Sequence, residues 1–214
     1  MKSILIIGLG RFGRHMARKF MEEGNSVIAL EVSEERANAA VTLIPNIEIA
    51  DATDEHVIES LGIDNFDICV VAIGDNFQAA LEITVLLKDF GGKFIIARAS
   101  RDVHRKLLLR NGADYVVYAE RDMAERLAMK FGARNVFDYI ELSKEIGIYE
   151  IATPESWYGK TILEKSVRSN YNVTILASKK DERIYPMMQP DHVFSPDESL
   201  LVMGSSEAVH KLTR

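Results

Sequence analysis

Three glycines near the start of the chain have the spacing of a phosphate-binding turn. Gly8, Gly10 and Gly13 form the pattern GxGxxG directly after the apolar run 3–7. In such a turn the first glycine lets the chain leave the strand sharply, the second lets a phosphate approach the backbone, and the third lets a helix lie close to the sheet. The helix would direct free N–H groups and the positive end of its dipole at an anion. The pattern predicts a nucleotide phosphate site at Gly8, Gly10, Arg11, Phe12 and Gly13.

An acidic residue follows the next apolar run. Residues 26–30 predict a second strand, and Glu31 comes directly after it, eighteen residues beyond Gly13. At about this spacing an acidic side chain accepts hydrogen bonds from the ribose diol of a bound dinucleotide. Its negative charge would repel a 2′-phosphate, which disfavours NADP.

Further polar residues stand where other predicted strands end. Asp51 and Thr53 would lie where they could bond the edge of an adenine, and Asn76 would lie near the ribose or a phosphate. Arg11 and Arg98 could neutralise a phosphate chain, because a guanidinium binds phosphate in a bidentate way. Taken singly, Thr53 also fits a helix cap and Arg98 a surface ion pair. Their common location favours a ligand site. The expected site residues beyond the glycine turn are Glu31, Asp51, Ala52, Thr53, Ala72, Ile73, Gly74, Asn76 and Arg98.

Only a parallel sheet would bring these residues to one edge. Strands and helices alternate six times within about 120 residues, which predicts a Rossmann-type doubly wound parallel sheet of the α/β class. The helix after the glycine turn carries Phe12, Met16 and Phe20 at the spacing of one buried face. We expect strands at 3–7, 26–30, 47–50, 68–73, 94–97 and 115–118, and further helices near 54–61, 77–90, 101–110 and 120–131.

The regular alternation of strands and helices ends at about residue 138. Short strands are expected at 147–151, 173–179, 184–187 and 199–204, with short helices near 162–167 and 206–212. This pattern predicts a small α+β domain, whose size makes it a candidate for packing in a dimer or against the first domain. The predicted organisation is a nucleotide-binding domain at 1–137 and a small C-terminal domain at 138–214.

Composition narrows the class of protein. Of the 214 residues, 47% are hydrophobic and 27% charged, which is an ordinary globular balance. The net charge of −6 argues against nucleic acid as a partner, since phosphate neutralisation needs a basic face. No apolar run reaches the roughly 20 residues of a membrane helix, and the start does not resemble a signal peptide, so we expect a cytoplasmic protein.

The single cysteine, Cys69, lies in an apolar run and is expected to be a buried strand thiol.

The residues do not favour an enzyme. A dehydrogenase needs a catalytic acid or base and a substrate pocket, but residues 138–214, which follow the sheet, have no cluster of His, Lys or Tyr. The histidines of the chain also lack zinc-site spacing. We therefore expect the nucleotide site to be the whole functional site. An NAD-dependent oxidoreductase is the alternative from the residues alone.

The same residues resemble a known family. The glycine turn, Glu31, the run 51–53, the run 72–76 and Arg98, followed by residues 112–114, Glu120 and Met123, resemble the RCK (regulator of potassium conductance) domain. The length in two parts resembles the cytosolic regulatory subunit (TrkA) of Ktr/Trk-type potassium uptake systems. Glu31 departs from the commoner aspartate of that family, a change that keeps the acceptor oxygens but lengthens the side chain.

The resemblance implies a function. In that family the subunits form an octameric ring beneath a membrane-embedded potassium channel or transporter subunit, at the inner face of the cell membrane. ATP and ADP, or NAD(H) in Trk members, change the shape of the ring and so gate the pore. By position, Arg11 would reach the terminal phosphate and Glu120 would help hold Mg²⁺ or Ca²⁺.

The sequence leaves open which nucleotide binds and whether the C-terminal domain has a ligand. ATP/ADP, NAD(H) and AMP share the adenosine and first phosphate that the glycines would bind, so the glycine turn does not distinguish them. Some relatives also bind cyclic di-AMP in the C-terminal domain, where Arg168, Asn172 and Ile175 fall in this chain. Besides the gating subunit and the oxidoreductase, a third hypothesis for the function is a ligand sensor with no channel partner.

Overall fold

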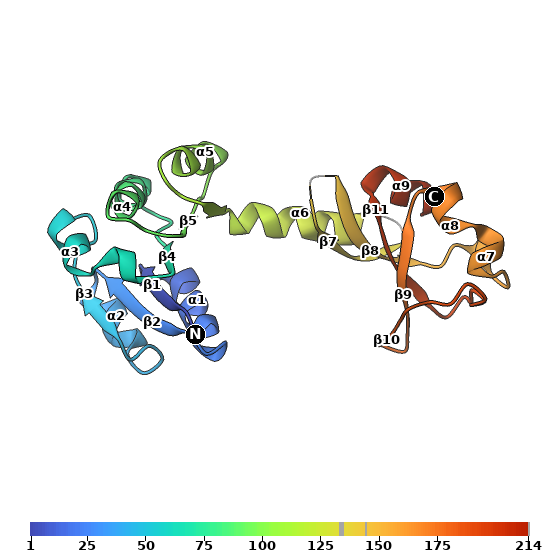
Figure 1. Ribbon diagram of the computed structural model, residues 1–214, viewed down its shortest axis with the longest axis horizontal. Helices are drawn as coiled ribbons and strands as arrows, with labels where there is room; N and C mark the ends of the chain where they lie inside the picture. Colours follow the sequence, from blue (N-terminus) through green and yellow to red (C-terminus); the bar gives the residue numbers. More distant parts are fainter. Residues whose placement is uncertain (133–134, 144, 214) are drawn as a thin grey trace. The chain divides into compact units, whose positions relative to one another are not determined.

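The computed structural model describes residues 1–132, 135–143 and 145–213. The chain divides into two compact units, Met1–Asp122 and Met123–Arg214. Figure 1 shows strands β1 to β5 of the first unit in blue to green and strands β7 to β11 of the second in yellow to red. The assignment of residues 1–137 and 138–214 to two functional domains stays a prediction.

A six-stranded parallel sheet forms the first unit. Its strand order, β3-β2-β1-β4-β5-β6, is that of the doubly wound nucleotide-binding fold. The predicted fold class is therefore confirmed, with strand ends within two residues of those expected. The strands are β1 (Ser3–Ile7), β2 (Ser26–Glu31), β3 (Ile47–Ile49), β4 (Ile68–Val71), β5 (Ile95–Arg98) and β6 (Tyr115–Val117).

Short polar side chains start several of the helices between these strands. Ser33, Asp54 and Asn76 each accept a hydrogen bond from a backbone N–H of the helix that follows. The helix after the glycine turn differs, because Gly10 precedes it without a side-chain cap. The helices are α1 (Arg11–Glu22), α2 (Glu34–Ala40), α3 (Glu55–Ser60), the 3₁₀ turn η1 (Ile63–Asn65), α4 (Phe77–Asp89), α5 (Asp102–Arg110) and α6 (Ala119–Gly132).

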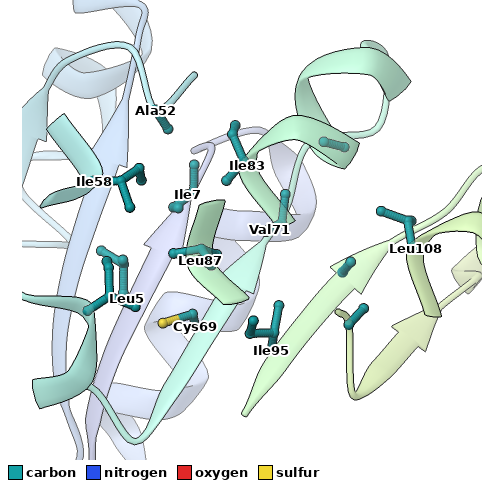
Figure 2. Close-up of a cluster of buried hydrophobic side chains, with 14 of the residues drawn as sticks. Leu5, Ile7, Ala52, Ile58, Cys69, Val71, Ile83, Leu87, Ile95 and Leu108 are labelled. Atoms are coloured by element: carbon teal, nitrogen blue, oxygen red, sulfur yellow. The ribbon is translucent and has the colours of Figure 1, made fainter. Parts of the chain in front are cut away.

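Apolar side chains cover both faces of the sheet. On one face, Ile4 and Ile6 of β1 pack with α1 and α2. On the other face, Leu5 of β1 and Cys69 of β4 pack with α3, α4 and α5, as Figure 2 shows. Burial raises the pKa of the Cys69 thiol to about 12, which confirms the expected buried strand thiol. The central strands, whose carboxyl ends carry the expected site, are thus packed on both faces.

The second unit is built on a five-stranded antiparallel sheet of order β10-β9-β11-β8-β7, so the predicted α+β class is confirmed. Trp157 and Phe194 are fully buried in its core. The elements are β7 (Val136–Glu141), β8 (Ile146–Ala152), the 3₁₀ turn η2 (Glu155–Trp157), α7 (Ile162–Lys165), α8 (Val167–Tyr171), β9 (Thr174–Lys180), β10 (Arg183–Pro186), β11 (Ser199–Ser205) and α9 (Ser206–Leu212).

Two details of the second unit differ from the sequence prediction. Strand β7 was not expected, and a bulge between Val136 and Asp138 interrupts the alternation that would have indicated it. The single helix expected near 162–167 is two helices, because Ser166 has a left-handed backbone conformation (φ 46°) between them.

Candidate functional site

A cleft of about 890 Å³ opens at the carboxyl ends of the parallel strands, within the first unit. The sequence predicted a ligand site at this edge, and nearly every residue expected there lines the cleft. Gly13 lies behind the turn, between helix and strand. The predicted residues on the wall are Gly8, Gly10, Arg11, Phe12, Glu31, Asp51, Ala52, Thr53, Ala72, Ile73, Gly74, Asn76, Arg98 and Glu120.

The three glycines of the turn have distinct surroundings. Gly8 has a positive φ of 94°, which favours glycine, and its N–H donates to the Leu30 carbonyl. A Cβ built on Gly13 would lie 1.9 Å from the Gly8 carbonyl oxygen, so α1 approaches the turn too closely for any side chain. A Cβ on Gly10 would meet nothing within 4 Å. Gly10 therefore leaves open space in front of the first turn of α1, where a phosphate would enter.

Glu31 is the most constrained polar residue of the cleft. Its side chain is 2% exposed and accepts hydrogen bonds from the Leu9 N–H (2.6 Å), the Ser33 N–H (2.9 Å) and Nη2 of Arg36 (2.7 Å). Burial alone would raise the pKa of the Glu31 carboxyl, but the bonds from Arg36 and the two amides outweigh it and lower this pKa. The carboxylate thus ties the glycine turn to the end of β2. A ribose diol bound here would donate to the same Glu31 carboxylate that already accepts from Leu9, Ser33 and Arg36.

Asp51, Thr53 and Asn76 have local partners. The Asp51 carboxylate accepts hydrogen bonds from the Thr53 N–H (2.9 Å) and hydroxyl (2.7 Å), which lowers the pKa of Asp51. The amide oxygen of Asn76 accepts from the Ala79 N–H at 3.1 Å and so caps α4. These bonds fix the shape of the loops after β3 and β4, and their role in holding adenine or ribose stays a prediction.

Arg98 and Glu120, which both line the cleft, form an ion pair. Nη2 of Arg98 donates to Oε1 of Glu120 at 2.6 Å. A Cβ built on Gly74 would lie 2.6 Å from Nη1 of Arg98, and the guanidinium carbon lies 5.7 Å from the centre of the Phe12 ring. The absence of a side chain at Gly74 therefore makes room for this guanidinium. The pKa of the Glu120 carboxyl is lowered by a hydrogen bond from its own backbone and by Arg98.

Two family models match the chain. The TrkA-N domain matches residues 4–119 and the TrkA-C domain matches residues 146–214. This chain belongs to the TrkA (RCK) family. The resemblance found in the sequence is thereby confirmed, and the TrkA-N match contains all of the cleft except Glu120.

Two curated relatives match this chain over nearly their whole length. The chain is 38% identical to Ktr system potassium uptake protein C of Bacillus subtilis, over 95% of this chain and 92% of the relative. It is 35% identical to Ktr system potassium uptake protein A of the same organism, over 98% and 95% of the two chains.

Solved structures repeat the fold. The GsuK channel bound to NAD superposes with a TM-score of 0.72 at 20% identity, over 100% of this chain and 39% of that one. The Kef C-terminal domain of Shewanella denitrificans in its AMP-bound form has a TM-score of 0.51 at 28% identity, over 60% of this chain and 78% of that one. The second match covers only part of this chain.

The sequence analysis missed Arg36, which lines the cleft and holds Glu31. A signal was present, because Arg36 is the only Lys or Arg between Lys19 and Lys88, in a stretch rich in Asp and Glu. An isolated cation among carboxylates is expected to pair with one of them. The structure shows that its partner is the predicted ribose acceptor.

The metal site and the cyclic di-AMP site expected from the resemblance stay predictions. Within residues 1–132, 135–143 and 145–213, no group of three or more His, Cys, Asp or Glu side chains is placed to hold a metal ion. The cation at Glu120 stays a prediction. Arg168 and Asn172 are exposed in and after α8, and Ile175 packs against the core of the second unit. None of the helices in the described part of the chain has the length and apolar character to cross a membrane.

Replacing Gly10 by alanine should separate binding from folding. The backbone of Gly10 (φ −63°) suits any residue, and the added methyl meets no protein atom, so we expect an unchanged urea midpoint. The methyl would stand between a phosphate and the α1 amides, so we expect nucleotide affinity to fall about tenfold or more, or about 1.4 kcal/mol. Calorimetry and urea unfolding of both proteins measure this. An unchanged affinity would mean that the phosphates do not pass over the turn.

Proposed function

We propose that this chain is a regulatory, nucleotide-binding gating subunit of a potassium uptake channel or transporter. The observation that carries the proposal is the 38% identity to a Ktr potassium uptake protein over 95% of the chain. The cleft supports it, since the glycine turn and Arg98 surround a space of nucleotide size. The chain acts by binding, not by catalysis.

The ligand proposed for the cleft is an adenosine nucleotide. AMP in the Kef structure and NAD in the GsuK structure both contain adenosine and one phosphate, the part that the turn and the end of β2 suit. We propose ATP and ADP as the physiological pair, with NAD(H) or AMP as the alternative ligand. A nucleotide shifts a ring between two shapes only by its difference in affinity for them, and a terminal phosphate supplies that difference.

The proposed partners follow from the same relatives. The chain joins a membrane-embedded potassium channel or transporter subunit and works at the inner face of the membrane, as a homo-oligomer that is a dimer or an octameric ring. A divalent cation at Glu120 and cyclic di-AMP near Arg168, Asn172 and Ile175 belong to this proposal.

One experiment tests the function directly. The purified chain is titrated with ATP, ADP, AMP and NADH by calorimetry, and potassium flux is measured in vesicles that hold its membrane partner, with and without the chain. We expect flux to depend on the chain and on which nucleotide is bound. A chain that binds none of the four nucleotides, or a flux unchanged by the chain, would contradict the proposal. Turnover of NADH with a carbonyl substrate would favour the oxidoreductase alternative instead.

Arg11 provides a sharper test of how the phosphates are recognised. Arg11 lines the cleft at the start of α1, and no hydrogen bond or ion pair ties it to the described part of the chain. If it reaches the terminal phosphate, Arg11→Ala weakens ATP more than ADP or AMP, by about 1–3 kcal/mol. Arg14→Ala, one turn further along α1 and outside the cleft, is the matched control. Equal losses for all three nucleotides would show that Arg11 does not contact the terminal phosphate.

A further inference from the structure

The guanidinium of Arg98 has incomplete hydrogen bonding. Nη2 donates to Glu120, but Nε is buried and has no acceptor among the described residues. A guanidinium carries five N–H donors, and a buried charged donor without an acceptor is costly. The position in which Arg98 bonds Glu120 is therefore not the one that satisfies the guanidinium best.

The surroundings of Arg98 allow a second position. The guanidinium is packed between Gly74 and the ring of Phe12 on the wall of the cleft, and its side chain is 23% exposed. The neighbouring glycine presents no side chain that would block a rotation. A phosphate in the cleft offers several acceptor oxygens and a charge at least as large as that of one carboxylate. Such a ligand would compete with Glu120 for the same donors.

Glu120 lies at a point where a change could be transmitted. It is the second residue of α6, and the boundary between the two compact units falls within this helix, after Asp122. The ion pair thus ties the first turn of α6 to the end of β5. Because the Glu120 side chain is 60% exposed, it can leave Arg98 for water at little cost.

We propose that Arg98 is a switchable tether between the ligand and α6. Without a nucleotide it bonds Glu120, and when a nucleotide enters it transfers to a phosphate and releases the first turn of α6. This rests on the proposed nucleotide function of the cleft. The tether accounts both for the unsatisfied Nε and for the placement of Glu120 at the start of the helix that joins the units.

Removing the Glu120 carboxylate, which competes with the ligand phosphate for Arg98, should strengthen ligand binding. If phosphate binding must break the Arg98–Glu120 pair, the pair and the ligand are negatively coupled, and this coupling is reciprocal. In Glu120→Gln the guanidinium is no longer held by a charged partner. We expect ADP affinity, measured with EDTA present so that no divalent cation takes part, to rise about two- to fivefold, the range for an exposed ion pair.

The experiment has two measurements and a matched control. ADP is titrated into wild type and Glu120→Gln, and amide hydrogen exchange is followed with and without ADP over residues 122–126, the first amides of α6 that can bond a carbonyl one turn back. Asp102→Asn is the control, because Asp102 pairs with the next residue of α6, Arg121, at 2.6 Å but lies outside the cleft. We expect ADP to speed exchange in this turn of wild type, Glu120→Gln to exchange fast without ADP, and Asp102→Asn to bind ADP as wild type does.

The outcomes separate this inference from the function on which it rests. If ADP binds wild type but Glu120→Gln has the same or a lower affinity, or if ADP leaves exchange in the first turn of α6 unchanged, the tether is wrong and the nucleotide site stands. If wild type binds no nucleotide, both are overturned.

Discussion

Gly13→Ala is expected to be the most damaging single substitution in the first unit. The new methyl would lie 1.9 Å from the Gly8 carbonyl oxygen and 3.1 Å from the Ala72 Cβ, and the nearest of these atoms is backbone that cannot rotate away. Alanine gains about 1 kcal/mol of helix propensity over glycine. The clash outweighs this gain, because α1 must leave its place on the sheet. We expect the free energy of unfolding to fall by about 3 kcal/mol or more.

Urea unfolding and calorimetric melting measure this loss. Gly10→Ala is the matched control, since it adds the same methyl on the same turn but meets no protein atom. A Gly13→Ala protein that unfolds at the wild-type midpoint would mean that α1 packs further from the turn than the structure shows. Loss of nucleotide binding alone, with stability intact, would equally contradict the packing role of Gly13.

The parallel sheet could be predicted because its signals are local. Each buried strand is a short apolar run followed by a turn residue, and β4 (Ile68–Val71) is apolar throughout, as a strand covered on both faces must be. The main errors were at strand ends. The prediction carried β4 on to residue 73, but Ala72 and Ile73 lie in the cleft wall. Apolarity does not distinguish the last residue of a strand from the first residue of a loop that lines a pocket.

The second unit was harder to predict. Strand β11 (Ser199–Ser205) alternates in burial, and both β11 and β9 (Thr174–Lys180) were expected. Strand β7 (Val136–Glu141) instead contains a bulge and two exposed apolar side chains. Its pairing with β8 depends on residues that follow it in the chain. Such a strand is stabilised by its neighbour more than by its own pattern.

The positions of the site residues were predictable, but their bonding was not. Strand ends meet at one edge in any parallel sheet, so Glu31 and Arg98 had to lie near the glycine turn. Whether Glu31 bonds a backbone amide, an arginine or a ligand depends on side-chain reach across segments that spacing does not describe. The bonds from Leu9, Ser33 and Arg36 turn a predicted ligand acceptor into a residue that also positions the turn.

Glu31→Ala is therefore expected to destabilise the fold as well as the binding site. It leaves the buried Leu9 N–H without its acceptor, which costs about 1–3 kcal/mol, and also the half-buried Ser33 N–H, whose loss costs less. The Arg36 side chain is 51% exposed and regains water, so its loss is smaller. We expect the free energy of unfolding to fall by about 2–4 kcal/mol. Urea unfolding at pH 7 measures it, with Glu35→Ala, an exposed acid in the first turn of α2, as the control.

The pH dependence of a second variant, Glu31→Gln, shows whether the charged form of Glu31 is responsible. Because the fold lowers the pKa of this carboxyl, its stabilising effect is complete above the ordinary glutamate pKa of about 4.3 and is lost as the pH falls through the lower pKa of the folded state. The difference in unfolding free energy between wild type and Glu31→Gln should thus be largest near pH 7 and shrink below about pH 4. A difference that stayed constant with pH would mean that the bonds from Leu9 and Arg36 do not depend on the charge. In that case Glu31 would hold the turn by shape alone, and the charge would serve the ligand.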